Sequence, residues 1–364
     1  MWVILESSGV TRCVMVGQFA ILRRIKSERK QRKDVAVCCR ISQSHMPTLS
    51  TLELCAGAGG QALGLELAGI DHVGLVEIDS NCCKTLRFNR PHWNVMQADL
   101  REFDAAEFKG VDLVSGGLPC PPFSVAGKQL GESDERNLFP AAIRIIEQVK
   151  PRAVMIENVR GILDAVFVDY RKFIAGELGR LGYHCDWKLL VASDYGVPQL
   201  RPRVVFVAIK GNDFHNFHWP LPSEDLAPTV GETLFDLIAA NGWRGAKAWK
   251  KQADEVGPTI VGGSLKHGGP DLGPTRARKA WASLGVDGIG IVDEAPARDF
   301  VGMPRLTVRM VARIQGFPDD WAFSGKKTAA YRQVGNAFPP PVARAVAGRI
   351  VECLTARHPL RVDA

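Results

Sequence analysis

The sequence predicts an α/β protein with a doubly wound, parallel sheet, and two observations support this. Short apolar runs alternate with helix-like stretches over the first half of the chain, beginning at Thr51. A turn rich in glycine follows the first of these runs, where strand-to-helix turns of nucleotide-binding folds lie. Strands that alternate with helices favour parallel pairing, because each helix carries the chain back to the start of the next strand.

The predicted strands are short runs rich in Val, Ile and Leu that are bounded by polar residues. They cover residues 51–55, 73–76, 111–115, 153–156 and 204–209. The predicted helices between them cover residues 61–68, 80–88, 138–149 and 170–181, and a last helix covers about 340–354. Apolar runs of this length suit strands that are buried on both faces.

The alternation stops after Lys210, and this divides the chain. We expect a catalytic and cofactor-binding domain at 46–212, a loop-rich second domain at 213–303, and a return to the catalytic domain at 304–364. The second segment is rich in Gly and Pro, but Trp243, Trp249 and Trp281 can form a core, which favours a domain over a disordered insert.

Residues 1–45 differ from the rest of the chain in charge. They hold nine Lys and Arg and three acids, which gives +6 of the total net charge of +7. We interpret this leader as an upstream extension outside the fold, with Met46 as the natural start. The alternative is a basic arm that contacts DNA phosphates.

Composition excludes several other classes of protein. No apolar run approaches the roughly 20 residues of a membrane helix, and the basic run follows the apolar stretch 13–22, which is the reverse of a secretory signal. The nine cysteines lack zinc-ligand spacing. We therefore expect a cytoplasmic, reduced protein that binds no metal.

The glycine turn predicts a nucleoside site. Gly57, Gly59 and Gly60 allow the backbone to approach a ligand closely. Glu77 ends the next predicted strand, where an acid can accept from both ribose hydroxyls. Asp99 ends a third strand, which precedes residues 111–115 and is not one of the apolar runs above, and it can accept from an adenine amine. No phosphate-binding lysine follows the glycines, which favours adenosine without phosphates over ATP.

A cysteine framed by prolines follows the fourth strand. Pro119, Pro121 and Pro122 restrict the backbone around Cys120, at the strand edge where α/β enzymes place their chemistry. A cysteine that only fills the core would not require such a frame. Cys120 is therefore a candidate nucleophile.

From about Leu52 to Ala347 the chain resembles the DNA cytosine-5 methyltransferases. The matching motifs appear in the family's order: 56–60 (AGAGG), 119–124 (PCPPFS), 157–159 (ENV), 199–203 (QLRPR), 305–309 (RLTVR), 315–318 (QGFP) and 335–336 (GN). Three departures stand out. Cys55 replaces the usual Phe against adenine, Glu53 replaces Asp, and Pro121 replaces the Gln that takes part in loop closure.

The resemblance implies how the residues act on a cytosine rotated out of double-stranded DNA. Cys120 as a thiolate adds to C6, Glu157 protonates N3, Arg203 contacts O2, and Arg201 supports the nucleophile loop. S-adenosylmethionine donates the methyl group. Its expected contacts are Cys55, Ala56, Gly57, Gly59, Gly60, Glu77, Ile78, Asp99, Leu100, Pro119, Asn336 and Ala337. The DNA contacts expected are Ser124, Lys128, Arg136, His267, Arg276 and Arg278.

Further expectations concern partners. The enzyme should act as a monomer on a palindromic site, beside a cognate restriction endonuclease with which it forms no stable complex. Two alternatives stay open: a tRNA cytosine-5 methyltransferase, whose recognition region would be shorter, and an inactive DNA-binding regulator, against which Cys120, Glu157 and Arg203 argue.

Overall fold

The computed structural model describes residues 2–7, 10–15, 48–119, 137–263 and 269–356. The chain forms two compact units, Met1–Met46 and Pro47–Ala364. In the first unit β1 (Trp2–Ser7) pairs antiparallel with β2 (Val10–Met15). This hairpin was not predicted from the sequence, although two apolar runs flank Ser7 and Gly9.

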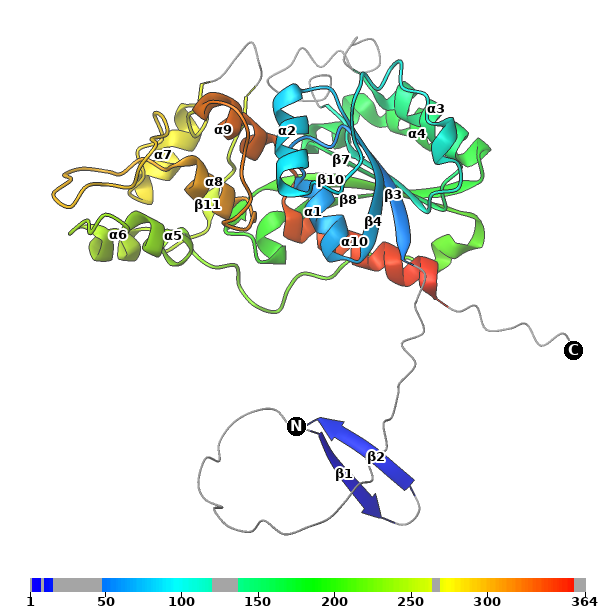
Figure 1. The fold of residues 1–364 in the computed structure, drawn as a ribbon, viewed down its shortest axis with the longest axis horizontal. Coiled ribbons are helices and arrows are strands. Elements are labelled where there is room, and N and C mark those ends of the chain that lie inside the picture. Colours follow the sequence, from blue (N-terminus) through cyan, green and yellow to red (C-terminus); the bar gives the residue numbers. More distant parts are fainter. Residues whose placement is uncertain (1, 8–9, 16–47, 120–136, 264–268, 357–364) are drawn as a thin grey trace, which may run out of the picture. The chain divides into compact units, whose positions relative to one another are not determined.

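The second unit is built on a seven-stranded sheet (Figure 1). The strands lie in the order β5 (Val95–Gln97), β4 (Ile70–Glu77), β3 (Leu49–Leu54), β6 (Leu113–Gly117), β7 (Ala153–Asn158), β10 (Pro202–Lys210) and β8 (Tyr183–Val191). The five strands from β5 to β7 are parallel. The doubly wound α/β class is therefore confirmed.

One part of that prediction was wrong, because the sheet is not parallel throughout. β10 runs antiparallel to both β7 and β8. Only residues 192–201 connect β8 to β10, which is too short for the helical crossover that a parallel pair requires. β8 itself escaped prediction because it is an edge strand whose residues alternate between buried and exposed.

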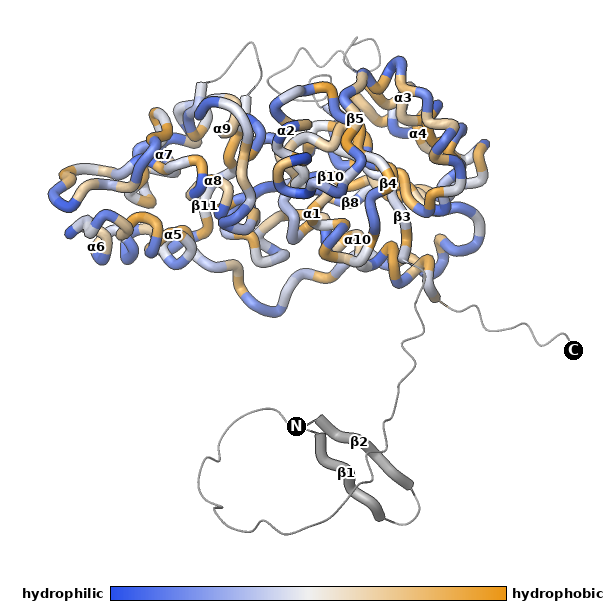
Figure 2. Tube along the Cα trace, viewed as in Figure 1, coloured by the Kyte–Doolittle hydropathy of each residue, from blue (hydrophilic) through white to orange (hydrophobic). Residues whose placement is uncertain are grey.

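Helices cover both faces of the sheet. On one face α1 (Gly60–Leu67) packs against α10 (Pro340–Thr355), and both share a core with Leu49 and Leu113. On the other face α3 (Phe139–Val149) and α4 (Val168–Arg180) share a core with Leu52 and Leu54. Adjacent residues of β3 thus face opposite layers, as strand geometry requires. In Figure 2 orange, hydrophobic stretches lie along the strands of the sheet, between paler and blue ones.

Capping explains how the second helix starts. The N-terminus of α2 (Ser80–Asn89) is capped by Asp79, whose carboxylate accepts from the backbone amides of Asn81 and Cys82. Short 3₁₀ helices connect the larger elements at Ala106–Phe108, Arg160–Leu163, Ala165–Phe167, Ala192–Tyr195 and Gly211–Asn216.

A second lobe lies beside the sheet (Figure 1). It contains α5 (Val230–Ile238), α6 (Ala246–Gln252), α7 (Thr275–Ser283), α8 (Val308–Ile314), α9 (Lys327–Asn336) and a short parallel pair, β9 (Gln199–Leu200) with β11 (Gly257–Pro258). Trp243, Trp249 and Trp281 are buried in one cluster with Met310 of α8 and Val334 of α9, so the expected tryptophan core is confirmed. Within the described residues, no helix is both long and apolar enough to cross a membrane.

Candidate active site

The strand order places the predicted site residues along one edge of the sheet. Going across the carboxyl ends, Asp99 follows β5, Glu77 ends β4, Gly57 follows β3, Pro119 follows β6 and Glu157 lies in β7. Neighbouring strands are about 4.8 Å apart, so Glu77 and Glu157 are separated by three steps, or roughly 14 Å. The chain reverses its direction of winding at β3, where α/β proteins bind their ligands.

The glycine turn adopts left-handed backbone conformations. Cys55, Gly57 and Gly59 have φ angles of 51°, 55° and 86°. A β-carbon on Gly57 would meet nothing within 4 Å, whereas one on Gly59 would lie 2.8 Å from Trp321, and one on Gly60 would lie 2.3 Å from the carbonyl oxygen of Phe338. Gly57 is thus the glycine of this turn that leaves space for a ligand, and the other two permit close packing.

Glu77 is bound into the same turn. Its carboxylate accepts from the backbone amide of Gly57 at 2.7 Å and from that of Asp79 at 2.8 Å. Burial raises the pKa of Glu77, and these two hydrogen bonds oppose the rise. Two acceptor positions of the carboxylate remain for a ligand's hydroxyl groups.

The other predicted cofactor contacts differ in exposure. Asp99 forms an ion pair with Arg101, whose guanidinium lowers the pKa of the carboxyl to about 2. Ile78 is 60% exposed, whereas Leu100 and Ala56 are buried. Cys55 is half-buried, and burial raises the pKa of its thiol well above the usual range. Asp99 would therefore contact adenine as a charged carboxylate that is already paired with Arg101.

Glu157 and Arg203 form the polar pair at the other end of this edge. Nε of Arg203 lies 2.7 Å from Oε1 of Glu157, and both side chains are largely buried. Burial raises the pKa of Glu157, while the charges of Arg203 and Arg201 act against that rise. A buried carboxyl with a raised pKa can hold a proton and donate it, as a general acid requires.

The nucleophile segment begins beside this pair. Gly117, the last residue of β6, is in register with Glu157, and a β-carbon on Gly117 would lie only 3.4 Å from Oε2 of Glu157. Pro119, exposed, is the last described residue before the candidate nucleophile. Cys120 itself lies outside the described residues, as do Ser124, Lys128, Arg136 and His267.

Arg201 performs a different task from Arg203. Arg201 falls in the break between β9 and β10, whereas Arg203 lies in β10. It is fully buried and donates to the carbonyl oxygens of Ile260 at 2.6 Å, Gly335 at 2.9 Å and Ala337 at 3.0 Å. These bonds join the start of β10 to the second lobe and to the end of α9.

Two buried glutamines complete this joint, and the sequence analysis assigned neither of them a role. Gln199 donates to Oε1 of Gln315 at 2.5 Å and accepts from the amide of Ile260 at 2.8 Å. Gln315 donates to the carbonyl oxygen of Ala337 at 2.7 Å. Both lie in matched motifs, which was the only sequence signal. We call Gln199, Arg201 and Gln315 the polar joint.

Asn336 and Ala337 lie at the end of α9, next to a glycine loop of the second lobe. The side-chain amide of Asn336 donates to the carbonyl oxygen of Gly263 at 3.3 Å. A β-carbon on Gly335 would lie 2.5 Å from the Cα of Gly262, so the two backbones are in contact. The expected cofactor contacts Asn336 and Ala337 are thus held by the polar joint and this loop.

The predicted DNA contacts on α7 point in different directions. Arg276 is exposed and Arg278 is half-buried against Gly288. Two residues correspond to about 200° around a helix, so these arginines cannot lie on the same face, whereas Lys279 shares a face with Arg276.

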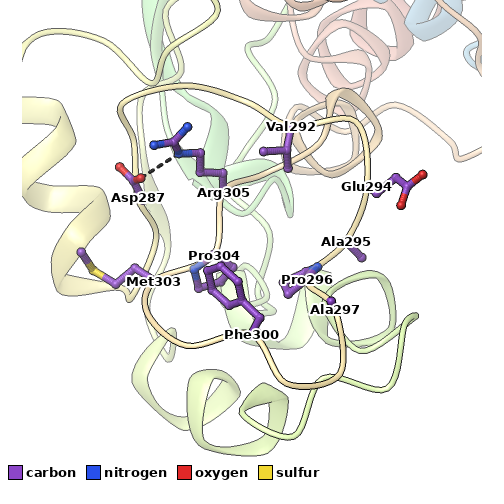
Figure 3. Close-up of a pocket in the computed structure, with 10 residues that line it drawn as sticks. All are labelled: Asp287, Val292, Glu294, Ala295, Pro296, Ala297, Phe300, Met303, Pro304 and Arg305. Carbon is purple, nitrogen blue, oxygen red and sulfur yellow. Dashed lines mark hydrogen bonds and ion pairs between the residues drawn. The ribbon is translucent and has the colours of Figure 1, made fainter.

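The second lobe also contains a cavity of about 390 Å³ (Figure 3). Its walls are mostly apolar, with an ion pair between Asp287 and Arg305 at 2.7 Å on one side. The segment 287–305 holds four acids and two arginines. The excess of acids over arginines disfavours the binding of DNA phosphates at this cavity.

Comparisons with known proteins agree with this geometry. A crystal structure from E. coli, described as a prophage-encoded DNA modification methyltransferase, is 25% identical with a TM-score of 0.60, over 85% of this chain and all of that one. The methyltransferase EhMeth of Entamoeba histolytica has a TM-score of 0.62 at 15% identity, over 85% of this chain and 99% of that one, which shows the fold alone. The sheet and the site together define a Rossmann-like methyltransferase.

The family follows from sequence similarity. The family model for C-5 cytosine-specific DNA methylases matches residues 49–352, and the chain belongs to that family. It is 54% identical to the type II methyltransferase M.NgoMIV of Neisseria gonorrhoeae over 84% of this chain and 98% of that protein. It is also 54% identical to M.NaeI of Lentzea aerocolonigenes, over 84% of this chain and 75% of that protein. The protein is therefore an enzyme that methylates cytosine in DNA, of the restriction-modification type.

Proposed function

We propose that the enzyme transfers a methyl group from S-adenosylmethionine to C5 of a cytosine in a short, specific duplex sequence, through a covalent bond between Cys120 and C6. The observation that supports this best is the buried Glu157–Arg203 pair beside the end of β6, three residues before Cys120. A buried acid and a cation next to a nucleophile are what addition to a cytosine ring requires.

The described residues fit the methyl donor. Gly57 leaves room at the turn, and the Glu77 carboxylate retains acceptor capacity for ribose hydroxyls. When bound, the donor supplies an electrophilic methyl group on a sulfonium. Ala56, Ile78, Leu100, Pro119, Asn336 and Ala337 are proposed to line the site, and Cys55 and Asp99 are proposed to face the adenine.

The chain's own residues then prepare and release the base. The Cys120 thiolate adds to C6 while Glu157 donates its proton to N3, so that the ring becomes an enamine and C5 becomes nucleophilic. Arg203 holds the cytosine O2, and Arg201 keeps the start of β10 in place. After methylation, water removes the C5 proton, the C6–sulfur bond breaks, and N3 returns its proton to Glu157.

Residues 213–303 are proposed to read the DNA sequence, with α7 contributing Arg276 or Arg278, and His267, Ser124, Lys128 and Arg136 adding contacts. The same segment in M.NgoMIV falls within the 98% of that protein that matches, so we propose that both enzymes methylate the same DNA sequence. We further propose a cytoplasmic monomer that acts beside a separate restriction endonuclease, as its type II relatives suggest.

Incubation with radiolabelled S-adenosylmethionine and either duplex DNA or tRNA tests this function. Label should enter DNA and not tRNA, and bisulfite sequencing should place it on C5 of one short palindrome. DNA already methylated by M.NgoMIV should accept no further label. Incorporation into tRNA alone would contradict the DNA assignment, while further labelling of the methylated DNA would contradict only the shared sequence.

A further inference from the structure

The glycine turn is held by a tryptophan from the far end of the chain. The indole Nε1 of Trp321 donates to the carbonyl oxygen of Ala58 at 3.1 Å, across 263 residues of sequence, and both groups are buried. A β-carbon on Gly59 would lie 2.8 Å from the ring. Trp321 therefore limits both where the turn lies and which residue can stand at position 59.

The Trp321 ring belongs to an aromatic cluster. Its centroid lies 6.2 Å from that of Trp93, and the guanidinium of Arg90 lies 5.1 Å from the first ring and 5.8 Å from the second. Arg90 also forms two-pronged hydrogen bonds with Glu66 of α1 at 2.7 to 2.9 Å. The aromatic cluster is thus bonded to the helix that begins at the turn.

A buried hydrogen bond between His72 and Glu53 lies next to this cluster. The ring of His72 lies 4.7 Å from Trp93, and its Nε2 is 3.1 Å from Oε2 of Glu53, with both side chains at most 1% exposed. Glu53 is two residues before Cys55, and burial raises the pKa of its carboxyl, while His72 and the backbone amide of Ala62 in the first turn of α1 act against that rise. The N-cap of α1 is Gly59, so no side-chain hydrogen bond caps this helix start.

Such a support is required because the turn is strained. Three of five successive residues, 55, 57 and 59, have positive φ angles, and one of them is a cysteine. A left-handed conformation is unfavourable for a residue other than glycine, and such conformations persist only where the surroundings impose them.

We propose that Glu53, His72, Arg90, Trp93 and Trp321 form a loop support that positions the turn 56–60 for the methyl donor, with Trp321 as its main positioning residue. This inference rests on the proposed cofactor site. None of the five residues is among the groups proposed to contact the base, so the support should affect binding of the donor and not the chemical step.

The replacement Trp321→Phe tests the proposal, because it keeps an aromatic ring at this position and removes the indole donor. We expect the Kd for S-adenosylmethionine, measured by calorimetry, to rise about fivefold to tenfold, as for one lost buried hydrogen bond. The kcat at saturating donor and the KM for DNA should stay within about twofold. Trp219→Phe is the matched control, because it removes an indole bond to Asp186 on the surface.

A second pair of variants covers the lower half of the support. His72→Gln keeps a hydrogen-bond donor toward Glu53 and should retain the affinity for S-adenosylmethionine. His72→Leu removes that hydrogen bond and should weaken this affinity by a factor similar to that of Trp321→Phe. Unchanged affinity in both Trp321→Phe and His72→Leu would overturn the inference. Glu77→Gln distinguishes failure of the loop support from failure of the proposed cofactor site. If all three variants leave the affinity for S-adenosylmethionine unchanged, the proposed cofactor site is wrong. If Glu77→Gln weakens binding and the other two do not, only the loop support is wrong.

Discussion

Replacing Gln315 by Leu should destabilise the fold strongly, although the side chain is proposed to contact neither substrate. The change preserves approximate volume and removes two hydrogen bonds of the polar joint, from Gln199 at 2.5 Å and to Ala337 at 2.7 Å. The side-chain amide of Gln199 then loses its acceptor on Gln315 in a fully buried position, while the carbonyl oxygen of Ala337 keeps Arg201 as a donor.

The magnitude follows from these partners. A buried donor left without an acceptor costs about 1–3 kcal/mol, and an ordinary hydrogen bond contributes about 1 kcal/mol. We therefore expect a loss of about 2–4 kcal/mol in the free energy of unfolding. Because the cost arises from an orphaned partner, Gln199→Leu and Gln315→Leu combined should cost less than their sum, with a coupling of about 0.5–3 kcal/mol.

Urea denaturation followed by circular dichroism measures both quantities. The matched control is Gln252→Leu, since Gln252 is exposed and makes one surface bond to the carbonyl oxygen of Ser283. The control should change stability by less than about 0.5 kcal/mol. A loss below 1 kcal/mol for Gln315→Leu, or strictly additive effects in the double variant, would refute the assigned role of the joint.

Three further predictions concern activity. Glu157→Gln should lower kcat by about 10²–10⁴-fold, and a Gln variant with normal turnover would rule out Glu157 as the acid. Burial raises the pKa of Glu157, so kcat of the parent enzyme should fall as the pH rises through that pKa and the proton is lost. Arg276→Ala and Arg278→Ala should affect DNA binding differently, because the two side chains leave α7 on opposite sides. Loss of a base-reading arginine should weaken binding by about 1–3 kcal/mol and relax one position of the site in bisulfite maps, whereas loss of a phosphate contact should weaken binding to all sequences alike. Identical effects of the two variants would count against this geometry. Removing residues 1–45 should leave DNA affinity and its salt dependence unchanged, whereas a shallower salt slope would identify the leader as a phosphate-binding arm.

The sheet was predictable where its strands are buried on both faces, because such strands leave continuous apolar runs. All six residues of β7 are buried, and its prediction differs from the observed strand only at the end. β5 has three residues and β8 alternates between buried and exposed positions, so neither leaves that signal. β10 is antiparallel because a short connection joins it to β8. The shortness of that connection could not be used for prediction, because β8 itself was not predicted.

The site was predictable as a set of chemical groups, and its supporting contacts were not. Glu77 and Glu157 stand out in the sequence because acids at strand ends are unusual enough to be noticed. The amide pair of Gln199 with Gln315 and the bond from Trp321 to Ala58 join residues that lie 116 and 263 positions apart. Periodicity reports only which face a residue lies on, so it cannot show such partners.

Trapping of the covalent adduct tests the central claim most directly. A duplex that carries 5-fluorocytosine at the target position should capture the enzyme in the presence of S-adenosylmethionine, because fluorine cannot leave C5 as a proton does. Denaturing electrophoresis and mass spectrometry should then show one DNA strand bound to the peptide that contains Cys120, and Cys120→Ala should show none. Full methylation of ordinary DNA by Cys120→Ala, or an adduct on another residue, would contradict the mechanism.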